Sequence, residues 1–377
     1  MRKHFAWSAR FRWALVLIIA VAGFLVPAVS AQAGEGGPKL TVLTRNIYQG
    51  TDLTNVVTAT TFPGFVAAVT QDWGNVVATD FPARARALAA EVRRVRPDVI
   101  GLQEVSLWRD QLVSDAVTGA PAPNATHVVY DFLAILQAKL ATAGVPYTVV
   151  SMSTNADVEA PRINPASPNG FTDVRLTDRD VILVRTPLAD KFVDPANGQY
   201  AVQLIAPSPA GPVSFTRGWA SIDYQQIAAR RVRIFNTHLE VDAPPVAGQV
   251  QVAQGAEALG VIAASPYPVV ALGDYNSDAN GSTTPTYGLL TRSLTDAWAT
   301  ARPGDPGNSC CQAELLNSVQ RATTRIDLVL TTGPWKVDRV QPTGDQPFRT
   351  GPAPLWASDH FGVTARLELP KPTRCAK

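Results

Sequence analysis

The order of hydrophobic and polar residues along the chain predicts strands that alternate with a few helices. Short apolar runs indicate strands, which cover residues 39–46, 98–104, 147–152, 180–185, 219–224, 232–238, 268–276, 325–330 and 361–369. Apolar residues recur at helical spacing in residues 83–95, 131–144 and 249–264. Segments rich in proline, glycine and asparagine are expected to be loops, and they cover residues 153–172, 241–248, 277–286 and 302–309.

The predicted elements form one domain rather than several. The chain has 377 residues, shows no internal repeat, and contains no linker long enough to divide it. Many strands with a few helices between them are typical of an α/β domain in which packed sheets are covered by helices.

The N-terminus has a different pattern from the rest of the chain. A basic start with four Lys or Arg residues precedes the apolar run WALVLIIAVAGFLVPAV, and SAQA follows it. This is the pattern of a signal peptide over residues 1–33, with small residues at Ala31 and Ala33 and cleavage after Ala33. The alternative is an uncleaved membrane anchor, which the short apolar run disfavours. Residues 34–38, GEGGP, would be a flexible linker, and the protein would be secreted or extracytoplasmic.

Removal of this segment changes the sign of the net charge. The whole chain has 33 basic and 31 acidic residues, and residues 1–33 contain four of the basic ones and none of the acidic ones. The remainder has 29 basic and 31 acidic residues, so its net charge is −2. This balance predicts no strong general attraction to a polyanion such as nucleic acid.

Three cysteines are present, Cys310, Cys311 and Cys375. In an oxidising compartment one bridge from the adjacent pair to Cys375 would hold the C-terminal tail, residues 371–377, to a loop, and one thiol would remain. The alternative is that all three are free. No CxxC motif or Cys/His ladder is present in the sequence, which disfavours a structural zinc site.

Polar side chains recur where the apolar strands end. These residues are Asn46, Gln103 and Glu104, Asn236 to His238, Asp274 and Asn276, Asp327, and Asp359 with His360. One such residue is weak evidence, because every strand end must leave the core. Carboxylate, carboxamide and imidazole groups at six strand ends indicate a single site for a cation or a phosphate.

The segment GDYN shows how such a site is built. In an extended chain Asp274 and Asn276 point to the same side, and Gly273 lets the backbone approach a ligand closely. A carboxylate can accept a proton from water or bind a metal, and a carboxamide can donate to a phosphoryl oxygen. Alone, the segment has an equally good interpretation as an Asx turn.

Each histidine, taken alone, also has a structural interpretation that needs no active site. His238 in FNTHLE reads alone as a buried core histidine, and Asp359–His360 in SDH reads alone as a cap. Two of the three histidines outside the signal segment nevertheless end strand-like motifs.

In chain order the motifs are Asn46, LQE at 102–104, THL at 237–239, GDYN at 273–276, RID at 325–327 and SDHFGV at 358–363. This ordered set resembles the endonuclease/exonuclease/phosphatase superfamily, which includes deoxyribonuclease-I-like nucleases, neutral sphingomyelinases and inositol polyphosphate 5-phosphatases. The resemblance covers roughly residues 39–370, which would form the catalytic domain. It implies an α/β (α+β) fold, a four-layer αββα sandwich of two mostly antiparallel sheets flanked by helices.

The resemblance also implies an activity and a set of roles. A divalent cation, usually Mg²⁺ with Mn²⁺ or Ca²⁺ as alternatives, would assist in-line attack of water on phosphorus. Asn46, Glu104 and Asp359 would hold the metal, and oxygen ligands of this kind suit a hard cation. The other roles fall to Asp274 for the water, Asn276 for the phosphate, His238 and His360 flanking the phosphate, and Asp327 orienting His360.

The substrate stays open between several classes. Arg179 and Arg185 lie in a segment that often faces substrate in this superfamily, although a surface arginine is the ordinary reading. The first hypothesis is an exported phosphodiesterase acting on a small or lipid-linked phosphoester. The second is an extracellular DNase I-like endonuclease, and the third is a binding protein that has lost catalysis. No stable protein partner is implied.

Overall fold

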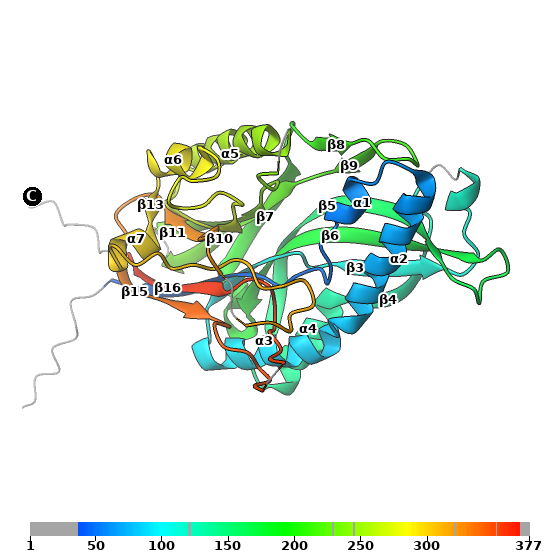
Figure 1. The fold of residues 1–377 in the computed structure, drawn as a ribbon. Helices are drawn as coiled ribbons and strands as arrows, with labels where there is room; N and C mark the ends of the chain where they lie inside the picture. The colour runs from blue at the N-terminus through cyan, green and yellow to red at the C-terminus, as the bar shows by residue number, and fades with distance from the viewer. Residues whose placement is uncertain are drawn as a thin grey trace, which may run out of the picture. The chain divides into compact units, whose positions relative to one another are not determined.

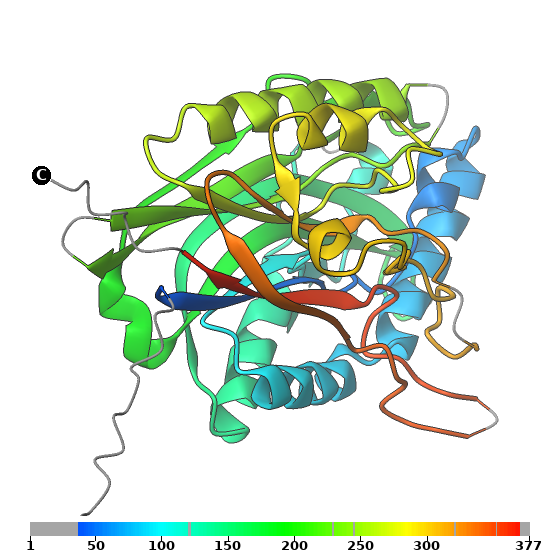
Figure 2. The ribbon, with the colours of Figure 1, turned by 90° about the vertical axis from the view of Figure 1, so that its left-hand side faces the viewer.

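Two large β-sheets stacked on one another form the centre of the computed structural model (Figure 1, Figure 2). The structure describes residues 37–119, 122–227, 230–243, 246–319, 322–351 and 353–369. The predicted signal peptide, most of the predicted linker and the predicted tail with Cys375 lie outside these residues. Within the described ranges, no helix is long and apolar enough to cross a membrane.

The strands and helices follow one another as follows. The strands are β1 Lys39–Asn46, β2 Val99–Gln103, β3 Leu107–Gln111, β4 His127–Asp131, β5 Tyr147–Ile163, β6 Phe171–Arg185, β7 Phe192–Gln199, β8 Leu204–Ala206, β9 Val213–Phe215, β10 Gly218–Ile227, β11 Arg230–His238, β12 Val269–Asp274, β13 Thr295–Asp296, β14 Asp327–Thr331, β15 Lys336–Thr343 and β16 Gly362–Glu368. The α-helices are α1 Thr54–Val57, α2 Phe62–Ala78, α3 Phe81–Val95, α4 Phe132–Thr142, α5 Ala247–Ala263, α6 Thr286–Thr291 and α7 Ala297–Ala301. Two short 3₁₀ turns cover Ala116–Thr118 and Thr186–Lys191.

Most of the strand pairs in both large sheets are antiparallel. The first sheet runs β15-β16-β1-β2-β6-β3-β4, with β5 paired to β6, and the second runs β13-β14-β12-β11-β10-β7. The pairs β1–β2 and β11–β12 are parallel, and the other described pairs are antiparallel. The hairpin β8–β9 stands apart as a small third sheet.

Helices cover the outer face of each sheet, which gives four layers (Figure 1). On the first sheet, Leu88 of α3 and Leu140 of α4 pack with Leu43 and Leu183. On the second, Ala258 of α5 and Leu290 of α6 belong to one cluster with strand residues such as Phe235. A third cluster fills the space between the sheets, with Val42, Val99, Ile234 and Val270 among its members. The predicted αββα sandwich is therefore confirmed.

Strand periodicity assigns each side chain to one of these layers. In β2, Val99 joins the cluster between the sheets, while Ile100 and Leu102 join the cluster under the helices. Gly101 faces the second sheet, and a Cβ there would lie 2.4 Å from Asn236 Oδ1. Asn236 uses this space to donate to the Leu102 carbonyl at 3.0 Å and to accept from Gln103 Nε2 at 2.6 Å. The two sheets are thus joined by hydrogen bonds next to the ends of their central strands.

The prediction of a loop over residues 153–172 was wrong in most of its length. β5 and β6 continue into this region as a long hairpin, and residues 157–163 pair with residues 171–177. Val158 and Ala160 are half-buried and pack toward α2, and Glu159 between them is also half-buried, accepting from the Asn124 and Ala125 amides at 2.8 and 2.7 Å. The strand therefore lacks a regular alternation of buried and exposed positions, and its proline and polar residues look like a loop in the sequence.

Helix α2 was missed altogether at the sequence level. Phe65, Val66, Val69 and Val76 are buried at helical spacing, and Thr61 caps the helix by accepting from the Gly64 amide at 3.3 Å. Pro63 and Gly64 in its first turn made the segment look like a loop. A proline in the first turn is compatible with a helix, because the amide groups there have no intrahelical acceptor.

Candidate active site

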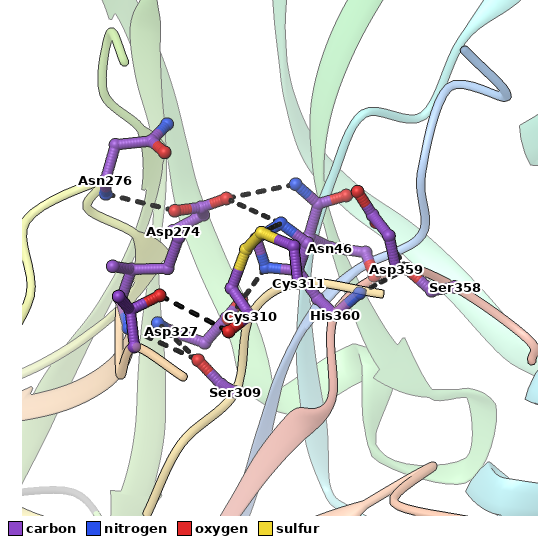
Figure 3. Close-up of a disulfide and its surroundings, with 12 residues drawn as sticks. Asn46, Asp274, Asn276, Ser309, Cys310, Cys311, Asp327, Ser358, Asp359 and His360 are labelled. Atoms are coloured by element: carbon purple, nitrogen blue, oxygen red, sulfur yellow. Dashed lines mark hydrogen bonds and ion pairs between the residues drawn. A yellow bond between two sulfur atoms is a disulfide. The ribbon is translucent and has the colours of Figure 1, made fainter. Parts of the chain in front are cut away.

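The central strands of both sheets end at the same place and carry the predicted polar residues there. In the second sheet, His238, Asp274 and Asp327 are cross-strand neighbours in one row, on β11, β12 and β14. In the first sheet, Asn46 pairs with Gln103 at the ends of β1 and β2, and Glu104 follows directly. The segment before β16 brings His360 to Asp327 and Asp274, and Asp359 lies beside Asn46 (Figure 3).

His360 is held as a protonated imidazole. Its Nδ1 lies 2.8 Å from Asp327 Oδ2, and both side chains are buried. Burial alone would lower the His360 pKa, but Asp327, Asp359 and Asp274 outweigh it and raise the pKa well above its ordinary value. Because Asp327 occupies Nδ1, the Nε2–H group is the one directed at the site, where it lies 3.6 Å from Asp274 Oδ2. This is the geometry that an orienting role for Asp327 requires.

His238 has the opposite protonation state. Its Nδ1 lies 2.9 Å from a guanidinium nitrogen of Arg217, which can only donate, so Nδ1 must be the acceptor. Burial, Arg217 and His360 all lower the His238 pKa well below its ordinary value. The neutral ring then carries its proton on Nε2, 3.6 Å from Asp274 Oδ2. The two histidines therefore direct one N–H group each toward the same carboxylate, one from a cationic ring and one from a neutral ring.

Asp274 is the centre of the site. Its Oδ2 accepts from Asn46 Nδ2 at 3.0 Å and its Oδ1 accepts from the Asn276 amide at 3.0 Å (Figure 3). Burial raises the Asp274 pKa, and with the opposing effect of His360 the value is about 6. Asn276 Nδ2 donates to the Leu239 carbonyl at 2.9 Å and also lies 3.1 Å from His238 Nε2. A neutral imidazole has only one acceptor nitrogen, and the shorter contact with the charged Arg217 assigns it to Nδ1. A carboxylate with this pKa is suited to accept a proton from water near neutral pH.

Glu104 and Asp359 are two further pocket carboxylates whose pKa values are raised even though the positive charge of His360 lies nearby. Asn46 Nδ2 donates to Glu104 Oε1 at 2.9 Å, and the Gln49 amide donates to Oε2 at 2.7 Å. Burial and then the charge of Asp359 raise the Glu104 pKa to about 7. Burial also raises the Asp359 pKa. Two carboxylates that destabilise each other's charge beside a carboxamide fit a hard divalent cation, which would offset that charge.

Other clusters of ligating atoms fit a cation less well. The ligating atoms of Asp274, Asp327 and His360 lie within 4.8 Å of one another, and so do those of Asp178, Asp180 and His238. In the first cluster the protonated His360 already balances the carboxylates. In the second, the charge of Arg217 serves the same purpose, because Arg217 lies 3.8 Å from Asp178 Oδ2. A further cluster, Asp115, Glu159 and Asp173, does not line this pocket, so within the pocket Glu104 with Asp359 is the better candidate.

The backbone around these side chains is held in unusual conformations. Tyr48, Glu104 and Asn276 have φ values of 59°, 57° and 48°, which residues other than glycine rarely adopt. The buried Arg84 of α3 fixes one of these turns, since it donates to the carbonyls of Ile47 at 2.7 Å and Tyr48 at 3.0 Å. It also donates to Ala357 at 3.1 Å, and so ties the segment before His360 to the end of β1.

These groups open into a pocket of about 1180 Å³, part of which is open solvent at its mouth. Its lining includes Glu104, His238, Asp274, Asn276, Asp359 and His360 from the predicted set, together with Arg217, Glu240 and Glu314. Acidic side chains outnumber basic ones in this wall. The N–H groups that an anion can meet in this wall include the two imidazoles and the Asn276 carboxamide, and a bound cation would add to them.

The sequence matches the model of the Endonuclease/Exonuclease/phosphatase family over residues 72–360. The chain belongs to this family. Its members are metal-dependent phosphoesterases and nucleases, and the protein is accordingly a metal-dependent hydrolase of phosphoester bonds. The resemblance found in the sequence is confirmed.

Solved structures share the fold at low sequence identity. A family protein from Bacteroides thetaiotaomicron is 14% identical with a TM-score of 0.54, covering 88% of this chain and 98% of that one. A family protein from Beutenbergia cavernae is 21% identical with a TM-score of 0.51, covering 88% of this chain and 72% of that one. The mannosyl-6-phosphatase of B. thetaiotaomicron is 15% identical with a TM-score of 0.50, covering 87% and 99%. No curated protein sequence matches the chain.

Two predicted residues are not brought to the family's site. Arg179 is buried and donates to the Val105 carbonyl at 2.7 Å and to Asp131 at 2.6 Å, so its guanidinium is used within the fold. Arg185 pairs with Asp98 at 2.6 Å. Asp98 immediately precedes β2, while Glu104 follows its other end, so Arg185 lies at the wrong end of the sheet. A substrate-binding role for either arginine is therefore corrected.

The cysteines also differ from expectation. Cys310 and Cys311 form a disulfide with each other, so the expected bridge from this pair to Cys375 is wrong. Cys375 itself lies outside the described residues. The adjacent sulfur atoms meet beside the site, with Cys311 Sγ 4.0 Å from His360 Nε2 (Figure 3). The disulfide therefore lies in the wall of the site next to the His360 imidazole.

Arg217 was the functional residue most clearly missed from the sequence. It lies just before β10, donates to His238, and pairs with Glu240 at 3.3 Å. A single arginine in the segment FTRGW has no spacing or motif that marks it. Its pairing with a strand-end histidine depends on the antiparallel register of β10 with β11, in which Trp219 lies opposite Thr237.

One further buried carboxylate near the pocket predicts a pH effect on stability. Asp72 of α2 is 3% exposed, neither of its oxygens is hydrogen bonded, and burial and then Glu314 raise its pKa from 3.8 to about 7. The folded state therefore holds a proton that the unfolded chain releases, so stability falls as pH rises from about 4 to about 7. Asp72→Asn removes this cost. Its stability advantage over the wild type should grow by about 1 to 3 kcal/mol between about pH 5 and about pH 8.

Urea unfolding at the two pH values measures this difference. The exposed Asp190 supplies the matched control, Asp190→Asn, for which the wild type and the variant should keep a constant difference. An Asp72→Asn advantage that shrinks as pH rises would contradict the assignment.

Proposed function

We propose that the protein is an exported, Mg²⁺-dependent phosphodiesterase that directs water to the phosphorus atom of its substrate. The proposal rests on one observation, the convergence of His238, Asp274 and His360 on a single point beside Glu104 and Asp359. Glu104 and Asp359, with Asn46 behind Glu104, would hold the metal. When bound, a divalent cation offsets phosphate charge and polarises the phosphoryl group.

The proposal assigns one role each to Asp274, His360 and His238. Asp274 accepts the proton of the attacking water, since its Oδ2 is the group that both histidines face. His360 is protonated and can stabilise the developing charge or give a proton to the leaving oxygen. His238 is neutral and serves as a fixed hydrogen bond donor to a phosphoryl oxygen, with Arg217 setting its tautomer.

A diester is favoured over a monoester or a nucleic acid strand by charge. The pocket wall is acidic, with Glu104, Glu240, Glu314 and Asp359 among its members. A phosphodiester carries one negative charge, whereas a phosphate monoester carries nearly two at neutral pH and a nucleic acid strand carries one per nucleotide. The singly charged group meets the least repulsion here. An extracellular nuclease remains the second hypothesis, and a binding protein without activity the third.

Export is proposed from the N-terminal pattern and is supported by the disulfide. Cys310 and Cys311 are bonded to each other, which fits an oxidising compartment. N-terminal sequencing of the secreted protein tests this, with Gly34 expected as the first residue. Recovery of a chain that still begins at Met1 would contradict export with cleavage.

Three substrates offered side by side test the function. With Mg²⁺ or Mn²⁺ the protein should hydrolyse bis-p-nitrophenyl phosphate, and it should cleave plasmid DNA much more slowly. Sphingomyelin shows whether a lipid head group is accepted. Faster turnover of plasmid DNA than of the small diester would favour the nuclease hypothesis, and no turnover of any of the three would favour the binding hypothesis.

A further inference from the structure

A second cavity lies next to the catalytic pocket. Its walls come from α1, α2, β5, β6 and the β8–β9 hairpin, which lie together on one side of the molecule (Figure 1). The space between these walls is about 650 Å³, part of which is open solvent at its mouth. Leu53, Val57 and Phe215 line both this cavity and the catalytic pocket, so the two spaces meet at these side chains.

The wall of this cavity is almost entirely apolar. Among its side chains are Phe65, Val69, Trp73, Trp108, Leu176 and Phe215. The rings of Trp73 and Trp108 meet edge to face with centroids 6.0 Å apart. Water gains few hydrogen bonds in such a space, whereas an alkyl group that enters it leaves water and gains packing contacts.

The cavity wall is coupled to the candidate metal ligand through one residue. The Trp108 indole donates to the Gln49 carbonyl at 3.0 Å, and the Gln49 amide donates to Glu104 Oε2 at 2.7 Å. A ligand group that contacts Trp108 is therefore separated from the Glu104 carboxylate by Gln49 alone.

One polar group in the apolar wall also lacks a partner. Neither oxygen of the buried Asp72 is hydrogen bonded, and the neighbouring Thr51 hydroxyl donates to Glu314 at 3.0 Å instead. Thr51 and Glu314 line the catalytic pocket, so Asp72 marks the side of the cavity that faces it. A ligand with a hydroxyl or amide near the start of an apolar chain would give this carboxyl group the partner that buried polar groups usually have.

We infer that this cavity takes an alkyl chain of the substrate, so that the substrate is a phosphodiester with one long apolar substituent. The inference rests on the proposed function, because the phosphate of the same molecule would lie between His238 and His360. One cavity of this size takes one chain. The occupant is therefore a single-chain phosphodiester in solution rather than a two-chain lipid in a bilayer.

A series of p-nitrophenyl alkyl phosphates tests the inference, with methyl, butyl and octyl esters used below their micelle concentrations. For the wild type, each methylene that enters the cavity should raise kcat/KM about two- to fourfold, mainly through KM. A flat dependence on chain length would overturn the inference while leaving the methyl ester as the measure of the proposed function.

Filling the cavity should remove the preference for long chains. Ala160 of β5 lines only the second cavity, and Ala160→Phe should leave the methyl ester's kcat/KM unchanged while it abolishes the increase toward the octyl ester. Ala67→Phe on the exposed face of α2 is the matched control and should keep the increase. Val213→Trp on the hairpin offers a second filled cavity should Ala160→Phe fail to fold. A retained chain-length increase in a folded, filled variant would overturn the inference.

Binding measurements separate this inference from the proposed function. Calorimetry with octyl methylphosphonate, which carries no p-nitrophenyl leaving group, should show tighter binding than with its methyl counterpart, and Ala160→Phe should remove the difference. That result without hydrolysis of any ester would support the cavity and contradict the diesterase. Faster hydrolysis of phosphatidylcholine vesicles than of monomeric lysophosphatidylcholine would overturn the single-chain source and point to the exposed Ile205 of the hairpin as a bilayer contact.

Discussion

Asp274→Asn is expected to lower kcat/KM for bis-p-nitrophenyl phosphate by about 10³-fold or more. The asparagine keeps the size of the side chain and its contact with Asn46 but cannot take a proton from water. Asp274 Oδ2 is also the atom that lies 3.6 Å from the Nε2 atoms of both His238 and His360, so the change removes the charge on which both rings converge. Steady-state release of p-nitrophenolate measures the loss.

The matched control for this variant is Asp98→Asn. Asp98 is also a carboxylate at the end of a central strand, but it lies at the opposite end of β2 and pairs with Arg185. The kcat/KM of the Asp98→Asn variant should stay within about threefold of the wild-type value when the same amount of folded protein is compared. Equal losses in the two variants would mean that Asp274 acts through stability, and thermal unfolding of both proteins distinguishes the two cases.

Removal of divalent cations is expected to abolish hydrolysis, and added Mg²⁺ or Mn²⁺ should restore it. The pKa values of Glu104 and Asp359 stay raised despite the nearby positive charge of His360, and a bound cation would supply further positive charge. Glu104→Gln removes one of the two charged ligands while keeping its shape. The Mg²⁺ concentration for half-maximal activity should then rise by about 100-fold or more.

Glu257→Gln provides the control for Glu104→Gln. Glu257 lies on α5 and accepts from the Ala201 and Val202 amides at 2.8 and 3.2 Å, outside the catalytic pocket. Its Mg²⁺ dependence should match that of the wild type. Full activity of the wild type in excess EDTA would rule out the role given to Glu104 and Asp359.

Much of this fold can be predicted from hydrophobic periodicity, and the exceptions have local causes. The apolar strands such as 268–276 and the helix at 83–95 carry strong, regular patterns, and both are present in the structure with shifts of a few residues. The strand over residues 157–163 is mostly half-buried without a regular alternation of buried and exposed positions, so its polar residues look like a loop in the sequence. Helix α2 was hidden by its first-turn proline and glycine. In both cases the deciding contacts come from segments far away in the chain.

The site was predictable where a single residue type at a strand end carries the chemistry. His238, Asp274 and Asp327 belong to adjacent strands, so their register follows from the strands themselves. The sequence does not show which neighbouring side chains set the protonation states of His238 and His360. Arg217 and Asp327 give the two histidines opposite charges, and this depends on side chains that meet only after the sheets have formed.

The same limit explains the two arginine errors. Arg179 and Arg185 stand on the strand β6, at positions whose partners are Asp131 and Asp98. Either residue reads in the sequence as a free cation near a phosphate site. A cation is free only if no carboxylate meets it in the fold, and that is a property of the assembled sheet rather than of the segment.

The most direct test of the account is the position of the oxygen atom that water contributes. Hydrolysis of bis-p-nitrophenyl phosphate by the wild type with Mg²⁺ in ¹⁸O-labelled water should place one heavy oxygen in the p-nitrophenyl phosphate product and none in p-nitrophenol. Mass spectrometry of both products reads this out, and the label should disappear with Asp274→Asn because turnover stops. Label in p-nitrophenol, or unlabelled products from active enzyme, would contradict attack of water on phosphorus at this site.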